Sequence, residues 1–222
     1  MKNLKQLKQQ YSDAGISQDG VCKDPVEQFR LWLDQAVDSG LAEAHGFCLA
    51  TVSEESKPSL RTVLMKSCDH DGLVFYTNHD SRKGRQLAEN NQVSALFPWY
   101  ELHRQINIEG TVTRVSDQLS IEYFKSRPRD SQISAWASRQ SETIASRRAL
   151  EQQQWQIEQK FSGQEIPLPT FWGGYRIKPD RFEFWQGRAH RLHDRILYIK
   201  KDSARQDNRH KDDQWEIVRL SP

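Results

Sequence analysis

Near the C-terminus, cationic, imidazole and indole side chains are concentrated in a short run. Residues 184–195 contain three arginines, two histidines and one tryptophan. This density of positive charge and hydrogen-bond donors would suit an anionic, aromatic ligand. A solvated turn between two strands could have the same composition, because runs of charge usually lie in water. Other segments of the chain are needed to decide between the two interpretations.

Within this run, Arg191 and His193 are two positions apart. Side chains two apart on an extended segment point to the same side, so both could face one pocket while Leu192 points away. We interpret this pair as the part of a site that contacts substrate. We expect no metal, because no Cys, third His or suitably placed carboxylate completes a ligand set with His190 and His193.

A second cationic motif, Ser81-Arg82-Lys83, opens a predicted short helix directly after a predicted strand. The free N–H groups and the positive end of the helix dipole would lie beside two cationic side chains, which is a suitable place for a phosphate. An ordinary capped surface helix with basic residues on it is the alternative.

A third motif places Tyr123, Arg127 and Ser131 four residues apart. This spacing would align them on one face of a continuous helix. Pro128 disfavours that arrangement, because it biases Arg127 toward an extended conformation. We therefore predict one helix that ends near residue 125 and a second that starts after residue 129, with a bend that can bring the three side chains to one small anion.

Length and composition indicate one soluble domain with a thin core. The 222 residues contain no Pro/Gly/Ser-rich linker, so we predict a flexible N-terminal arm over residues 1–23 and a single domain over 24–222. The hydrophobic fraction is 36% and the mean hydropathy is −0.84, although seven Trp and nine Phe supply large buried areas. A thin core suggests a partner subunit.

Charge and motifs exclude several classes of protein. The 32 basic and 30 acidic residues leave a net charge of +2, which is too small for a typical nucleic-acid-binding domain. No Gly-x-Gly-x-x-Gly or P-loop supports dependence on nicotinamide or ATP. The N-terminus has no apolar secretion signal and no later run approaches membrane-spanning length, so we expect a cytoplasmic protein with no membrane partner.

The periodicity of apolar residues predicts an α+β fold with a mainly antiparallel sheet. Asp24 as a cap and Pro25 as the first helical residue predict a helix that runs to Gly40. Its apolar face would consist of Val26, Phe29, Leu33 and Val37. We predict strands over residues 47–52, 60–67, 72–78, 92–99, 104–115, 181–186, 195–200 and 215–220. We predict helical segments over residues 117–124, 130–137 and 141–161. Ile106 and Ile108 should point into the core, with Gln105, Asn107 and Glu109 on the other face.

Six segments together resemble the FMN-dependent pyridoxine (pyridoxamine) 5'-phosphate oxidase family. They are residues 61–66, 75–78, 81–83, 126–132, 171–174 and 191–195, and the resemblance runs from about residue 24 to the C-terminus. It implies an FMN-binding split β-barrel with peripheral helices, and a homodimer with FMN at the subunit interface. The implied reaction converts pyridoxine or pyridoxamine 5'-phosphate to pyridoxal 5'-phosphate by hydride transfer to flavin, which O2 reoxidises with release of H2O2.

The resemblance also implies roles for individual residues. Those that match the family's FMN contacts are Arg61, Thr62, Val63, Leu64, Met65, Lys66, Tyr76, Thr77, Arg82, Lys83, Gln105, Gln140, Ser141, Trp185 and Arg195. Those that match its substrate contacts are Lys8, Tyr11, Lys66, Tyr123, Arg127, Ser131, Arg191, Leu192 and His193. Arg191 and His193 would be catalytic. Lys8 stands where the family often has an arginine, and lysine lacks the bidentate fork of arginine.

Three questions stay open at the level of sequence. Arg61 and Lys66 lie on opposite faces of an ideal strand, so a twist, a bulge or a strand end near Lys66 is needed to give them their two roles. Trp185 could be a core aromatic, and Gln140 with Ser141 could be a helix start. Rival functions are a flavin-binding split-barrel reductase or flavin-storage protein without this activity, and an RNA-binding β-barrel.

Overall fold

The computed structural model describes residues 15–201 and 214–222. The chain forms two compact units. Unit 1 consists of residues 1–48, 94–110 and 179–222, and unit 2 of residues 49–93 and 111–178. Four strands begin in one unit and end in the other: β1 (Gly46–Val52), β5 (Gln92–Trp99), β6 (Arg104–Arg114) and β7 (Trp172–Gln186).

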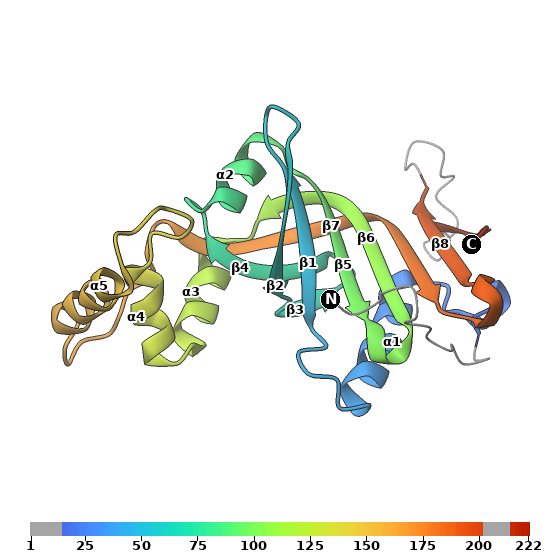
Figure 1. Ribbon diagram of the computed structural model, residues 1–222, viewed down its shortest axis with the longest axis horizontal. Coiled ribbons are helices and arrows are strands. Elements are labelled where there is room, and N and C mark those ends of the chain that lie inside the picture. Colours follow the sequence, from blue (N-terminus) through green and yellow to red (C-terminus); the bar gives the residue numbers. More distant parts are fainter. Residues whose placement is uncertain (1–14, 202–213) are drawn as a thin grey trace, which may run out of the picture. The chain divides into compact units, whose positions relative to one another are not determined.

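The described residues contain one nine-stranded sheet and five α-helices (Figure 1). The hydrogen-bonded strand order is β2-β1-β5-β6-β7-β4-β3, and β8 pairs with both β7 and β9. The other strands are β2 (Pro58–Leu64), β3 (Ser67–Asp69), β4 (Gly72–Asn78), β8 (Asp194–Lys200) and β9 (Trp215–Leu220). The helices are α1 (Pro25–Asp38), α2 (Arg82–Glu89), α3 (Asp117–Ser126), α4 (Arg129–Ala137) and α5 (Arg147–Lys160).

In unit 1, helix α1 begins and ends as predicted. The Asp24 side chain accepts a hydrogen bond from the Val26 N–H at 2.7 Å, and Gly40 follows the helix with φ 78°. The buried face differs from our prediction, because Val37 is 57% exposed. The buried positions are Pro25, Val26, Gln28, Phe29, Trp32 and Ala36. The buried face is rotated by about one residue from the predicted one, because the Trp32 ring packs edge-on against Phe184 with centroids 5.3 Å apart.

The core of unit 1 is aromatic. Phe97 lies 5.0 Å from Phe29 and 5.1 Å from Phe47, measured between ring centroids. Ile106 and Ile108 of β6 are fully buried, as predicted. Pairing of β7 with β8 and of β8 with β9 is antiparallel throughout.

Unit 1 also contains short helical segments near α1 and β6. The one-turn helices η2 (Gln18–Gly20) and η3 (Tyr100–Leu102) lie before α1 and between β5 and β6. Gln18 donates to the Ile217 carbonyl at 2.8 Å, and the Tyr198 hydroxyl donates to the Cys22 carbonyl at 2.7 Å. Gln18 and Cys22, which we assigned to the arm, are thus hydrogen-bonded to β9 and β8 respectively.

In unit 2, strand β4 pairs antiparallel with the first six residues of β7 and with β3. Helices α3, α4 and α5 lie together beside these strands (Figure 1). They share a core made of Phe124, Ile133, Phe161, Ile166 and Trp172. No helix of the described part of the chain has the length and apolarity to cross a membrane.

Three predicted elements need correction. Strand β7 begins at Trp172, nine residues earlier than predicted, and Gly173 and Gly174 lie inside it. These glycines mark close approach, because a Cβ at Gly174 would lie 2.8 Å from the Tyr76 ring and one at Gly173 2.8 Å from His79 Nε2. The strand predicted over residues 60–67 is interrupted between β2 and β3.

The helix predicted from residue 141 begins instead at Arg147. The Ser146 side chain caps it by accepting a hydrogen bond from the Ala149 N–H at 3.1 Å. Ser141 has φ 74°, a left-handed conformation that does not start a helix. The interpretation of Gln140 and Ser141 as a helix start is therefore wrong.

Candidate active site

Helix α2 and strand β2 of unit 2 bring three cationic side chains together. Arg61 is half-buried on β2, and its Nη1 donates to the Leu49 carbonyl at 2.9 Å and to Thr51 Oγ1 at 2.7 Å. Its Nη2 donates to Ser59 Oγ at 2.6 Å. Arg82 and Lys83 open α2 directly after β4, as predicted, and the Ser81 hydroxyl accepts the Gly84 N–H at 3.2 Å.

Lys83 is 8% exposed although it carries a charge. Its Nζ donates to Gln140 Oε1 at 2.7 Å and to Thr77 Oγ1 at 3.0 Å. Burial, together with the nearby charge of Arg61, lowers the pKa of Lys83 to about 8. We call Arg61, Arg82 and Lys83 the α2 cation cluster.

Among the described residues, the α2 cation cluster has no balancing carboxylate. Burial lowers the pKa of Arg61, and the charge of Arg82 adds to this effect. Within residues 15–201 and 214–222, no carboxylate forms an ion pair with any of the three. Three cations that repel one another beside a helix N-terminus form a cradle for an anion such as a phosphate.

Two supporting residues of this cluster were not predicted. Gln86 is buried, and its Oε1 accepts hydrogen bonds from Thr51 and Ser59, both at 2.6 Å. Gly84 lets α2 approach β4, because a Cβ there would lie 2.0 Å from the His79 carbonyl oxygen. Neither role has a signal in the sequence, since each depends on a neighbour from another element.

Strand β2 ends between Arg61 and Lys66, so the two residues do not lie on one continuous strand. Strand β2 ends at Leu64, and Lys66 lies between β2 and β3 with its N–H bonded to the Val74 carbonyl at 2.8 Å. Thr62 and Lys66 are exposed, whereas Met65 is buried in the core. Of the three possibilities that the sequence left open, the structure has the strand end.

The Tyr123, Arg127 and Ser131 motif has the predicted bend. Helix α3 ends at Ser126, Arg127 is extended, and α4 begins after Pro128. The Tyr123 ring stacks on Tyr76 with centroids 3.9 Å apart, and the Arg127 guanidinium lies 4.7 Å from the centroid of Trp172. Arg127 Nη1 is buried without a hydrogen-bond partner, and burial lowers the pKa of Arg127. A half-buried guanidinium with a buried, unused donor is suited to a second anion.

In unit 1, the segment with Arg191 and His193 is a tight turn and not strand-like. Gln186 pairs with Asp194 across β7 and β8, so residues 187–193 must connect the two strands. They include the one-turn helix η4 (Ala189–Arg191), in which His190 and Arg191 have φ 58° and 62°. The prediction that Arg191 and His193 lie on an extended segment is therefore wrong, because the short hairpin connection requires left-handed residues.

His193 nevertheless has a defined orientation in this turn. Its Nδ1 accepts the Arg188 N–H at 3.0 Å, and its ring lies 4.7 Å from Trp185. Leu192 is 70% exposed. The turn thus fixes one ring beside a tryptophan and leaves an apolar side chain at the surface.

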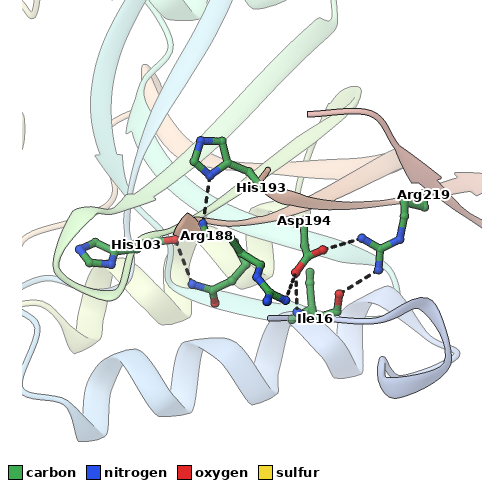
Figure 2. A network of polar contacts seen from close by, with 7 residues as sticks. Ile16, His103, Arg188, His193, Asp194 and Arg219 are labelled. Carbon is green, nitrogen blue, oxygen red and sulfur yellow. Dashed lines mark hydrogen bonds and ion pairs between the residues drawn. The ribbon is translucent and has the colours of Figure 1, made fainter. Parts of the chain in front are cut away.

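The remaining arginines of this hairpin are paired with carboxylates. Asp194 accepts hydrogen bonds from Arg188 and Arg219, as Figure 2 shows. Arg195 donates to both carboxylate oxygens of Glu183, at 2.7 and 3.0 Å. We call Arg188, Arg195 and Arg219, with Asp194 and Glu183, the hairpin ion-pair cluster.

The predicted site residues divide between the two units. Unit 2 holds residues 61–66 with Tyr76, Thr77, Arg82, Lys83, Tyr123, Arg127, Ser131, Gln140 and Ser141. Unit 1 holds Gln105, Trp185, Arg191, Leu192, His193 and Arg195. That residues of the two units form one site stays a prediction. Lys8 and Tyr11 lie outside the described residues.

Unit 2 also contains a cavity of about 850 Å³ that none of the predicted residues line. Its walls include Phe161, Leu168 and Trp172. Acidic and basic groups both line it, and Lys125 and Glu165 pair with each other at 2.7 Å. The cavity therefore lacks the unbalanced positive charge of the α2 cation cluster.

Comparisons with known proteins agree with the resemblance. Residues 33–161 match the family model described as pyridoxamine 5'-phosphate oxidase, and residues 172–222 match the model of the pyridoxine 5'-phosphate oxidase C-terminal dimerisation region. A pyridoxine/pyridoxamine 5'-phosphate oxidase of Rubrobacter xylanophilus is 46% identical over 100% of this chain and 97% of its own length. One from Crocosphaera subtropica is 47% identical over 99% of this chain and all of its own.

Solved structures share the fold. The crystal structure of PhzG from Burkholderia lata, in complex with tetrahydrophenazine-1-carboxylic acid, has a TM-score of 0.85 at 27% identity and covers 96% of this chain and 100% of its own. An FMN-binding protein related to pyridoxamine 5'-phosphate oxidase from Nostoc punctiforme has a TM-score of 0.67 at 17% identity, covering 87% and 97%. With the antiparallel sheet, these likenesses confirm the predicted α+β split-barrel fold. Because the sequence matches span the whole chain, the protein belongs to the pyridoxine/pyridoxamine 5'-phosphate oxidase family.

Proposed function

We propose that the chain oxidises pyridoxine 5'-phosphate or pyridoxamine 5'-phosphate to pyridoxal 5'-phosphate with FMN as cofactor. FMN would supply the acceptor for the hydride from the 4' carbon, with O2 as the final oxidant and H2O2 as the product. The observation that carries this proposal is that unit 2 has two partly buried cationic groups with no carboxylate partner among the described residues, the α2 cation cluster and Arg127. Two phosphorylated rings, the cofactor and the substrate, need two such groups.

The residues of the α2 cation cluster fit the phosphate of FMN. Burial and mutual repulsion lower the pKa of both Arg61 and Lys83. A phosphate dianion beside them would remove this repulsion and would accept hydrogen bonds from charged donors, which are the strong ones. Thr77 and Gln140, which now accept from Lys83, would hold the ammonium group in place.

The Tyr123, Arg127 and Ser131 motif fits the phosphate of the substrate. Trp172 lies beneath the Arg127 guanidinium and limits its movement, and the unused Nη1 is available for an acceptor. Lys66, exposed at the strand end, would add a second positive charge. Binding the phosphate away from the reacting carbon positions the ring without changing the chemistry at that carbon.

Arg191 and His193 would complete the site from the β7–β8 turn. In this proposal they contact the ring of the substrate and hold its 4' carbon toward the flavin. The guanidinium of Arg191 would also stabilise negative charge that develops on the ring. Gln105, Trp185 and Arg195 of the same unit would contact the flavin.

We propose that the protein works as a homodimer with FMN at the subunit interface. The match of residues 172–222 to a dimerisation region supports this arrangement, because those residues include Trp185, Arg191 and His193. Large apolar side chains at the surface of each unit also support it. They are Leu60, Tyr100 and Leu192, which are between 66% and 75% exposed.

The visible spectrum of the purified protein tests cofactor, substrate and reaction together. We expect a yellow protein whose flavin absorbance bleaches when pyridoxine 5'-phosphate is added without air, and returns when air is admitted. A yellow protein that the substrate does not bleach would favour the flavin-storage or reductase alternative. A colourless protein that FMN does not turn yellow would overturn the proposal.

Variants of the turn test its assigned part. Arg191→Met and His193→Asn should keep bound flavin but lower kcat/KM by about 10²-fold, the size of effect that misplaced reactants produce. Glu109→Gln is a suitable control, because it removes an exposed carboxylate of unit 1 whose partner Arg181 lies 3.6 Å away. Unchanged turnover in both turn variants would remove these residues from the site.

A further inference from the structure

Asp194 is the best-bonded carboxylate of the hairpin ion-pair cluster, and it lies directly after His193. It is 8% exposed, and Figure 2 shows it between two arginines and the backbone of Ile16. Its Oδ1 accepts from Arg219 at 2.5 Å. Its Oδ2 accepts from Arg188 at 3.3 Å and from the Ile16 N–H at 3.1 Å.

The surroundings keep this carboxylate charged. Burial raises the pKa of Asp194, but hydrogen bonds from Arg219, the Ile16 N–H and Arg188 outweigh burial, and the net pKa is lowered. The packing is tight, because a Cβ at Gly15 would lie 2.1 Å from Arg188 Nη1 and 2.7 Å from Asp194 Oδ2. Asp194 and Arg188 are thus held as an ionised pair of fixed geometry.

Arg188 connects this pair to the turn. Its side chain bonds Asp194, while its backbone N–H donates to His193 Nδ1 at 3.0 Å (Figure 2). Between these two contacts the chain passes through His190 and Arg191, both left-handed. Left-handed residues other than glycine are costly and persist only when neighbouring contacts hold them. The bonds from Arg188 to His193 and Asp194 join the start of the turn to its end.

The same bond determines which nitrogen of His193 carries a proton. A backbone N–H can only donate, so Nδ1 must supply the lone pair. The proton of the neutral imidazole is therefore on Nε2. Protonation of Nδ1 would break the bond to Arg188 and loosen the turn.

We propose that Asp194 is a positioning residue that acts through Arg188 to hold His193 as its Nε2–H tautomer and to hold Arg191 in its left-handed conformation. This inference rests on the proposed function, which places Arg191 and His193 against the substrate. Asp194 itself contacts neither substrate nor flavin in this arrangement. Its carboxylate holds the turn and not the ligand.

Two pairs of variants in the full-length holoenzyme test the role. Asp194→Asn keeps the shape but removes the charge, and Arg188→Met removes the donor while the backbone N–H stays. Both should lower kcat/KM for pyridoxine 5'-phosphate by about 10²-fold with bound flavin unchanged. Arg188→Lys, which still offers a charged donor to Asp194, should stay near the wild-type value. Glu109→Gln again serves as the control.

The nitrogen-15 chemical shifts of labelled histidine provide a readout that a merely structural role would not move. In the wild-type enzyme, His193 should show a proton-bearing Nε2 and an unprotonated Nδ1. In Asp194→Asn and Arg188→Met the two shifts should move toward each other as the tautomers mix. If Asp194→Asn does not fold, the two Arg188 variants test the role instead. We expect these variants to fold, because the Arg188 side chain is 38% exposed and Arg219 still pairs with Asp194 in them.

The outcomes separate this inference from the proposed function. Failure of pyridoxine 5'-phosphate to bleach the flavin of the wild-type enzyme would count against the proposed function itself. Loss of activity in His193→Asn, together with normal kcat/KM or unchanged His193 shifts in Asp194→Asn and Arg188→Met, would overturn only the positioning role.

Discussion

The α2 cation cluster and the hairpin ion-pair cluster use the same side chains in opposite ways. In the hairpin cluster, Arg188 and Arg219 bond Asp194, and Arg195 bonds Glu183. In the α2 cluster, Arg61 and Lys83 bond only neutral oxygens of the described residues. The difference indicates two roles for a cation: one paired with a carboxylate stabilises the chain, and one left unpaired is reserved for an anionic ligand.

Arg195 of the hairpin ion-pair cluster and Lys83 of the α2 cation cluster have pKa shifts of opposite sign. Hydrogen bonds from Arg195 to Glu183 raise the pKa of Arg195, whereas burial lowers the pKa of Lys83 to about 8. The first cluster is stable as it stands. In the second, repulsion between the cations is a strain that a bound phosphate would relieve. Removing a cation should therefore lower stability in the hairpin ion-pair cluster and weaken ligand binding in the α2 cation cluster.

Lys83→Met should produce the largest effect of this contrast. Loss of a charge-assisted hydrogen bond costs about 1.5 to 3 kcal/mol, so the Kd for FMN should rise about 10- to 150-fold. The thermal stability of the apoprotein should stay the same or increase, because a buried charge is removed. Fluorescence titration of FMN and a melting curve without FMN measure both. Lys57→Met is the matched control, since Lys57 is an exposed lysine of unit 2. An unchanged Kd for FMN would contradict the assignment of the α2 cation cluster to the phosphate of FMN.

Arg127→Ala extends the contrast to the second unpaired cation. The KM for pyridoxine 5'-phosphate should rise by a factor of about 10 to 10², with bound flavin unaffected. Steady-state kinetics of this variant beside Arg147→Ala, which removes an arginine from an exposed i,i+4 pair of α5, measure the effect. A KM equal to that of the control would place the substrate phosphate elsewhere.

Arg219→Gln should act on stability instead. Asp194 would keep Arg188 and the Ile16 N–H but lose its nearest donor, at a cost of about 1 to 2 kcal/mol in the free energy of unfolding. Urea denaturation of this variant beside Arg181→Gln, which breaks only an exposed pair, checks the value. The Kd for FMN should stay unchanged. If Arg219→Gln were as stable as Arg181→Gln, the hairpin ion-pair cluster would not have the stabilising role that distinguishes it from the α2 cation cluster.

The pH dependence of apoprotein stability should show the strain at Lys83 directly. The folded-state pKa of about 8 lies below the ordinary value of 10.5, so between these values the unfolded chain binds more protons than the folded one. Stability from this residue therefore rises with pH in that window, by about 1.4 kcal/mol per pH unit at most. The difference between wild type and Lys83→Met isolates it from other groups that titrate there. A flat difference between pH 8 and 10.5 would contradict the strain.

Much of the local structure could be predicted from the sequence. The cap at Asp24, the cap at Ser81 and the break at Pro128 were predicted correctly, because capping hydrogen bonds and proline sterics act within a few residues. Strands β4, β5 and β9 have the predicted bounds, since their apolar residues, their alternation and their bounding turn residues are local signals. The family resemblance rests on short motifs that are local as well.

The use of each cation was decided only by the tertiary structure. Asp194 meets Arg219 from 25 residues away and Ile16 from 178 residues away, and no local signal reports such encounters. The left-handed turn at Arg191 and the early start of β7 at Trp172 likewise depend on which strands pair. The sequence by itself therefore determined which cationic side chains are present and which helix or strand carries most of them. Only the fold decided which of them meet a carboxylate and which are left for a phosphate, because the pairing of charges depends on segments far apart in the chain.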